Sequence, residues 1–158
     1  MGSIELALQE QNIILPEPVK PVADYKTYSV EGNIVIISGQ LPMAEGVIAE
    51  EHKGQVGSHV SIEQAQDAAR ICGLNLLSQV KDACDGDLER VKSCLRLGIF
   101  VSSTAEFTEH HLVANGVSRL IVSALGKERG VHARAAVGVA QLPLGACVEV
   151  EATFSIHP

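Results

Sequence analysis

One arginine and two glutamates near the end of the chain have side chains that could bind and transform a small acid. Arg134 lies in "VHARAAVGVA", and Glu149 and Glu151 alternate with valines in "VEVEA". A guanidinium stays charged, and its planar fork can bind a carboxylate through two parallel hydrogen bonds. A glutamate can orient and deprotonate a water molecule. Three roles are open for these charges: solubility, subunit contact or chemistry.

The hydrophobic pattern places these three charges on two strands, over residues 131–139 and 148–156. In the first strand Arg134 shares a face with His132, Ala136 and Gly138. In the second strand the two glutamates alternate with an apolar face. Small neighbours leave room for a concavity beside the arginine. We therefore expect Glu149 to lie opposite Arg134 across that concavity, on the neighbouring strand.

Four further elements precede these strands. Turn residues 31–33 separate two β-rich runs and predict a hairpin within residues 25–40. Ser61 and Gln64 have the spacing of a capping box, so a helix should begin there and end near Asp85-Gly86. Alternation over 91–102 predicts a long strand, with residues 93 and 95 on its apolar face. A second amphipathic helix should cover residues 110–125 and end at Gly126.

The order of these elements is typical of an α+β sheet with both helices on one face. We expect one domain over residues 1–158, with residues 1–21 as an N-terminal extension and 42–60 as a long loop that has a short strand near 46–48. The run 34–37 is apolar on both faces, so its second face should also be covered. A partly apolar, uncovered sheet face predicts an oligomer, because large exposed apolar patches are unusual on monomers.

Composition excludes several classes of protein. The net charge is −7 and aromatic residues make up 3%, which argues against nucleic-acid binding by phosphate neutralisation and base stacking. No apolar run approaches the ~20 residues of a membrane span, and Glu5 and Glu10 interrupt any signal peptide, so we expect a cytoplasmic protein. No metal site is expected, since His110 and His111 would point about 100° apart on a helix. The cysteines have no paired spacing and should be reduced and buried: Cys72, Cys84, Cys94 and Cys147.

Three stretches resemble the RidA/YjgF family of reactive-intermediate deaminases, which has also been labelled endoribonuclease L-PSP. They are "GNIVIISGQLP", "HARAAVGVAQLPLGACVEVEA" and, more loosely, "VANGVSRLIVSALG". The resemblance covers roughly residues 22–155, and the loop before the first long helix is similar to a longer subgroup of the family. It implies a chorismate-mutase-like fold, a homotrimer whose sheets form a central barrel, and active sites in clefts between subunits.

The resemblance also implies a role for five side chains. The family's substrate-carboxylate arginine matches Arg134, and the glutamate that handles the attacking water matches Glu149. Matches to substrate-binding positions are found at Tyr25, Ser38 and Asn115.

The family reaction hydrolyses an enamine or imine of a 2-amino acid to a 2-keto acid and ammonia. The imine is already electrophilic, so no metal or organic cofactor is expected. Ala136 occupies the place of a cysteine found in many deaminase members. A second reading is therefore a non-enzymatic trimer that binds a small carboxylate metabolite in the same cleft. A ribonuclease is a third reading, which the acidic charge and the scarcity of aromatic residues disfavour.

Overall fold

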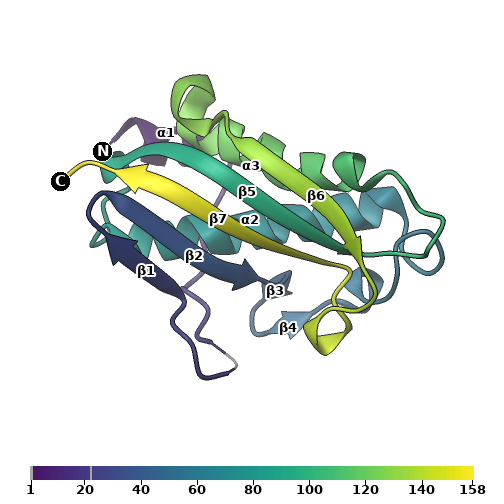
Figure 1. Cartoon of the computed structure of the whole chain (residues 1–158). Coiled ribbons are helices and arrows are strands. Elements are labelled where there is room, and N and C mark those ends of the chain that lie inside the picture. Colours follow the sequence, from purple (N-terminus) through teal and green to yellow (C-terminus); the bar gives the residue numbers. More distant parts are fainter. Residues whose placement is uncertain (1, 22) are drawn as a thin grey trace.

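A five-stranded sheet covered on one face by two long helices organises the chain, whose computed structural model describes residues 2–21 and 23–158 (Figure 1). The strand order is β1-β2-β7-β5-β6, and every pair is antiparallel except β5 with β6, which is parallel. The α+β prediction with both helices on one face is confirmed. The strand bounds are β1 (Tyr28–Glu31), β2 (Ile34–Gln40), β5 (Val91–Ser102), β6 (Ala133–Val139) and β7 (Val148–Ile156).

The first long helix, α2 (Ile62–Ala83), begins at the predicted capping box. The Ser61 hydroxyl accepts a hydrogen bond from the Gln64 backbone N–H at 3.1 Å, and the Gln64 side chain accepts one from the Ser61 N–H at 2.9 Å. These two bonds satisfy backbone donors that have no partner inside the helix. The helix ends before Asp85 and Gly86, both of which have positive φ.

The second long helix, α3 (His110–Gly130), extends beyond its predicted end. Gly126 has φ 84° and ψ 162°, so the regular helical path stops where the sequence predicts, and a further turn then runs to Gly130. The inner faces of α2 and α3 pack on β7, β5 and β2. Burying each large apolar side chain contributes roughly 1.5–3 kcal/mol. The largest fully buried ones include Phe154, Leu76, Leu77, Leu97, Ile99 and Ile121.

Strand β5 corrects one prediction about side-chain faces. Its pairing with β7 shifts register between Val91 and Ser93 and again between Cys94 and Arg96. Each irregularity changes which face the following residue occupies. Cys94 is therefore buried and Leu95 is 41% exposed, the reverse of the predicted alternation. From Leu97 onward the predicted alternation is correct.

Buried polar side chains of α2 hold two segments beside the sheet. The Ser78 hydroxyl donates to the carbonyl of Pro16 at 2.6 Å, and the Gln79 side chain donates to that of Val19 at 2.8 Å. Asn75 donates to the carbonyls of Leu41 and Met43 at 3.1 and 3.0 Å. Because these side chains are almost fully buried, the bonds offset a real desolvation cost. The chain before β1 and the chain after β2 are thereby tied to one helix.

The remaining elements are short. The β1–β2 hairpin is confirmed, with Gly32 at φ 57° in its turn. The predicted short strand near residues 46–48 is also confirmed, as half of a small hairpin, so the 42–60 loop is more ordered than its composition indicates. Within the described residues, no helix combines the length and the apolar character needed to span a membrane. The short elements are α1 (Ser3–Glu10), β3 (Met43–Ala44), β4 (Val47–Ile48) and three 3-10 turns, Glu50–His52, Leu88–Arg90 and Pro143–Gly145.

Candidate functional site

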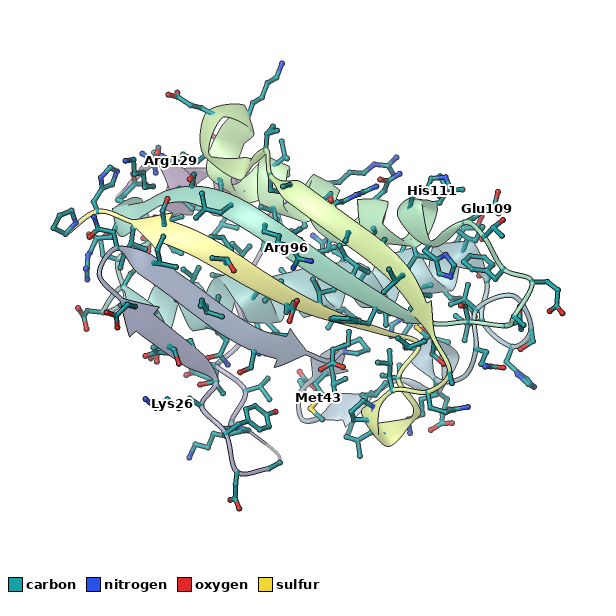
Figure 2. The ribbon with its side chains drawn as sticks, in the orientation of Figure 1. Lys26, Met43, Arg96, Glu109, His111 and Arg129 are labelled. Carbon is teal, nitrogen blue, oxygen red and sulfur yellow. The ribbon has the colours of Figure 1, made fainter. Side chains whose placement is uncertain are left out.

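Arg134 lies on the edge strand β6 and points toward the first three turns of α3. Its Nη1 group donates to the Asn115 Oδ1 atom at 3.0 Å and to the Ser118 hydroxyl at 2.9 Å. Its Nη2 group donates to the carbonyl of His111 at 3.0 Å. Figure 2 labels His111 near the start of α3, beyond β6. Two residues matched to the family, Arg134 and Asn115, are thus in direct contact.

The guanidinium of Arg134 keeps part of its binding capacity. An arginine has five N–H donors, and both of those on Nη1 and one on Nη2 are used by α3. The Nε–H and the second Nη2–H remain free for a ligand. Across the part of the chain that the structure describes, no carboxylate pairs with this exposed charge. The arginine is therefore fixed in place and still able to bind an anion.

The two glutamates of β7 differ in their partners, although both lie on the uncovered face of the sheet. Glu151 forms an ion pair with Arg96 at 3.2 Å, and Figure 2 shows Arg96 on this face. Glu149 has no hydrogen-bond or ion-pair partner among residues 2–21 and 23–158. Burial, and then the negative charge of Glu151, raise the pKa of Glu149 above its ordinary value. A half-buried carboxylate without a cation is suited to accepting a proton from water.

Tyr25 and Ser38 belong to the same end of the sheet as Glu149. The Ser38 hydroxyl donates to the carbonyl of Lys26 at 2.6 Å, and this bond holds the segment that carries Tyr25. Lys26 is labelled at the lower left of Figure 2. Tyr25 is 46% exposed and lines a small cavity of about 30 Å³ together with Gly39, which contacts the side chain of Glu149. These residues form one cluster, and Arg134 with Asn115 forms another.

The two clusters lie on opposite faces of the sheet, so the expectation that Glu149 lies opposite Arg134 on the neighbouring strand is wrong within one chain. The neighbour of β6 is β5, and β7 lies beyond it. Arg134 pairs with Leu97, which is buried under the helices, whereas Glu149 pairs with Phe100 on the uncovered face. The parallel β5–β6 pair separates the last two strands of the chain, and their registers on β5 place Arg134 and Glu149 on opposite faces.

Two features of the arginine cluster were not identified as site residues from the sequence. Ser118 follows Asn115 by three residues on α3, a spacing that puts both side chains on one helix face. The carbonyl of His111 could not be identified from residue types at all. Ala136 lies on the same face of β6 as Arg134 and packs partly against the core. No group of three histidine, cysteine or acidic side chains within the described ranges has the geometry of a metal site.

Comparisons with known proteins place this arrangement in a family. A family model described as "YjgF/chorismate_mutase-like, putative endoribonuclease" matches residues 5–153. Protein TCP17 of Trypanosoma cruzi is 44% identical over 99% of this chain and 96% of its own. The crystal structure of Atu1372 from Agrobacterium tumefaciens, a protein of unknown function, is 45% identical, covers 98% of this chain and 94% of its own, and has a TM-score of 0.88.

A more distant structure shares the fold and was solved with a small molecule. Escherichia coli TdcF with bound serine is 19% identical, covers 90% of this chain and 94% of its own, and has a TM-score of 0.62. The fold and the family match agree with the motifs around Ser38, Arg134 and Glu149. The chain belongs to the YjgF/chorismate mutase-like family, which includes the RidA proteins.

Proposed function

We propose that this protein hydrolyses 2-imino acids and their enamine tautomers to 2-keto acids and ammonia, in the cytoplasm and without a cofactor. The observation that carries the proposal is the state of Arg134. Three hydrogen bonds to α3 hold its guanidinium, and it keeps free donors and an unpaired charge in a chain of net charge −7. A stabilising surface arginine in an acidic protein would more simply pair with a carboxylate.

Because Arg134 and Glu149 lie on opposite faces of one sheet, the proposal requires a site between two copies. The single domain of residues 1–158 would form a homotrimer, with the arginine cluster of one subunit facing the glutamate cluster of the next. The uncovered sheet face supports assembly, since Ile36 is 55% and Val137 is 48% exposed on it. Burying such a face stabilises an oligomer. The number three follows from the family.

In the proposed reaction, Arg134 binds the substrate carboxylate and places the C=N carbon beside Glu149. Glu149 accepts a proton from water as the oxygen forms its bond to that carbon and the imine nitrogen takes up a proton from solvent, which gives a carbinolamine. The protonated Glu149 then returns its proton to the nitrogen. The C–N bond breaks as the hydroxyl group loses its proton to solvent and becomes the keto oxygen, so that ammonia and a 2-keto acid leave. Positioning alone can lower such a barrier by up to about 7–11 kcal/mol. The raised pKa of Glu149 favours its role as a proton carrier.

The other family-matched residues would bind and orient the substrate. Asn115 keeps its amide N–H donors, since only its oxygen is used by Arg134. The hydroxyl of Ser38 donates its hydrogen bond to the carbonyl of Lys26. Its oxygen could therefore only accept a hydrogen bond from a substrate, for example from an imine N–H. The hydroxyl of Tyr25 would line the mouth of the cleft. The serine bound to TdcF, itself a small carboxylate, supports a ligand of this class.

A second candidate function is binding without turnover. It is favoured by Ala136, which leaves the arginine strand without the cysteine that many deaminase members carry. In this case the trimer would hold a small 2-oxo or amino acid against Arg134 and release it unchanged. A ribonuclease is disfavoured by the net charge of −7 and by an aromatic content of 3%.

The test measures how far each protein variant raises the rate of ammonia release from freshly generated 2-iminopropanoate above the spontaneous rate. Wild type, Arg134→Ala and Arg119→Ala would be assayed, the last as a control on an exposed arginine of α3, the helix that Arg134 contacts. We expect loss of activity only in Arg134→Ala. Calorimetric titration with pyruvate separates the alternatives, and Arg134→Ala should weaken binding about tenfold to a hundredfold. Binding of pyruvate by wild type without ammonia release would support the second function. If wild type neither binds pyruvate nor releases ammonia, the proposed site is refuted.

A further inference from the structure

A chain of hydrogen bonds runs from the backbone at the end of α3 to the guanidinium of Arg134. The His132 Nδ1 atom lies 2.6 Å from the carbonyl oxygen of Gly130, and its Nε2 atom lies 2.8 Å from the Ser118 hydroxyl. The same hydroxyl lies 2.9 Å from Arg134 Nη1. His132 immediately precedes β6, two residues before Arg134, and the Ser118 hydroxyl of α3 contacts both side chains. We call these three side chains and the Gly130 carbonyl the arginine relay.

The direction of each bond in the relay follows from donor and acceptor chemistry. A carbonyl oxygen only accepts, so the Nδ1 atom of His132 must carry a proton. In the neutral imidazole the Nε2 atom is then an acceptor, and it takes the hydroxyl proton of Ser118. The Ser118 oxygen therefore turns its lone pairs to Arg134, which can only donate. The Gly130 carbonyl thus fixes the proton of His132 on Nδ1, and His132 in turn directs the hydroxyl proton of Ser118 away from the guanidinium.

The start of the relay is a fixed point, because Gly130 packs against its own helix. A Cβ at this position would lie 2.7 Å from the Val122 Cα atom and 2.9 Å from the Ile121 carbonyl oxygen. Only a residue without a side chain allows the last turn to fold back so closely. This contact fixes the backbone at Gly130, and the hydrogen bonds of His132 and Ser118 connect that fixed carbonyl to Arg134.

We propose that Ser118 and His132 are positioning residues that hold Arg134 in the orientation that receives the substrate carboxylate. The inference rests on the proposed function for its ligand but not for its geometry. Asn115 and the His111 carbonyl restrain two further donors of the guanidinium, one on Nη1 and one on Nη2. Without the relay one Nη1 donor is unpaired, so the guanidinium can rotate and lose the alignment of its free Nε and Nη2 edge. Affinity for a 2-oxo acid should then fall, whereas the fold should not change.

The experiment uses matched pairs of variants and titrates each with pyruvate. Ser118→Ala removes the hydroxyl and Ser118→Thr keeps it. His132→Asn keeps a donor for Gly130 but is too short to accept from Ser118, and His132→Gln restores an acceptor near the Nε2 position. We expect the first member of each pair to weaken binding about threefold to tenfold and the second to stay within about twofold. The double variant Ser118→Ala/His132→Asn should bind no worse than Ser118→Ala, because both changes break one relay.

Two results would overturn the proposal: His132→Asn with wild-type affinity, or losses that multiply in the double variant. A second readout does not need a ligand. Nitrogen–proton NMR of the Arg134 side chain, assigned with Arg134→Lys, should show separate Nη signals in wild type that average in Ser118→Ala and His132→Asn. If wild type binds no 2-oxo acid, the proposed function fails, and the NMR comparison still decides the relay. Identical Arg134 spectra in all variants would refute it.

Discussion

Gly39 of β2 lies directly beneath the side chain of Glu149 of β7. A β-carbon on residue 39 would come within 2.8 Å of the Glu149 Cδ atom and 3.0 Å of its Cγ atom. The backbone of Gly39 is not in the left-handed region, so an alanine fits the strand and only the carboxylate must move. We expect Gly39→Ala to reduce the rate of ammonia release about tenfold to a hundredfold, with a melting temperature close to that of wild type. The effect should vanish in a Glu149→Gln background, and an unchanged rate would mean that the carboxylate position is unimportant.

The separation of Arg134 and Glu149 predicts complementation between inactive subunits. Each site would take its arginine from one chain and its glutamate from another. Arg134→Ala and Glu149→Gln, inactive alone, should regain up to about a quarter of wild-type activity when unfolded together at equal amounts and refolded as mixed trimers. The control is the same mixture without the unfolding step. Persistent inactivity of properly assembled mixed trimers would show that both residues act from one chain.

The raised pKa of Glu149 predicts a pH dependence of stability. A carboxyl group whose pKa is higher in the folded than in the unfolded state stabilises the fold below its unfolded value of 4.5, and this stabilisation is lost as pH rises through the folded pKa. Glu149→Gln carries no charge at any pH. Its melting temperature should therefore rise relative to wild type as pH increases from about 4.5 and then level off. Glu151→Gln removes one cause of the raised pKa but also breaks the pair with Arg96, so its gain should be smaller than that of Glu149→Gln. A pH-independent difference for Glu149→Gln would contradict the assignment.

The four cysteines should be unreactive in the folded protein. Burial raises the pKa of Cys94 to about 12 and that of Cys147 to about 12, and it also raises the pKa of Cys72 and Cys84. The thiolate is the reactive form, so little is available at pH 8. Alkylation followed by mass spectrometry should label native protein slowly and find four free thiols after unfolding. Fewer than four thiols in the unfolded, unreduced protein would reveal a disulfide.

Local signals in the sequence predicted most of the elements. The capping box of Ser61 and Gln64 and the turn at Gly32 depend on neighbouring residues only, and both are confirmed. The faces predicted for Cys94 and Leu95 were wrong. A β-bulge depends on the partner strand and cannot be recognised from the alternation of apolar and polar residues alone. In helix α3, Gly126 ended the regular path as predicted, but the extra turn to Gly130 follows from packing rather than from propensity.

The candidate site was less accessible to sequence reasoning. The resemblance implied that Arg134 and Asn115 are both site residues, and the two are in contact. The predicted position of Glu149 opposite Arg134 was wrong, because the prediction assumed that strands adjacent in the sequence are adjacent in the sheet. A parallel crossover through α3 brings β6 to the edge of the sheet. The residues between β6 and β7 contain no sequence signal that predicts this placement. The roles of Tyr25, Ser38, Asn115, Arg134 and Glu149 in catalysis stay predictions.

The last strand in chain order, β7, occupies the centre of the sheet between β2 and β5. During synthesis the ribosome releases β2, both helices and β5 before residues 148–156 emerge, so the earlier strands have no central partner. The apolar inner faces of α2 and α3 then stay exposed, because the sheet that they cover lacks its central strand. Exposed apolar surface of this kind leads nascent chains to recruit chaperones or to aggregate. Folding of this sheet is therefore expected to be completed only after residues 148–156 have left the ribosome, and a premature stop before β7 should yield an insoluble product rather than a smaller folded protein.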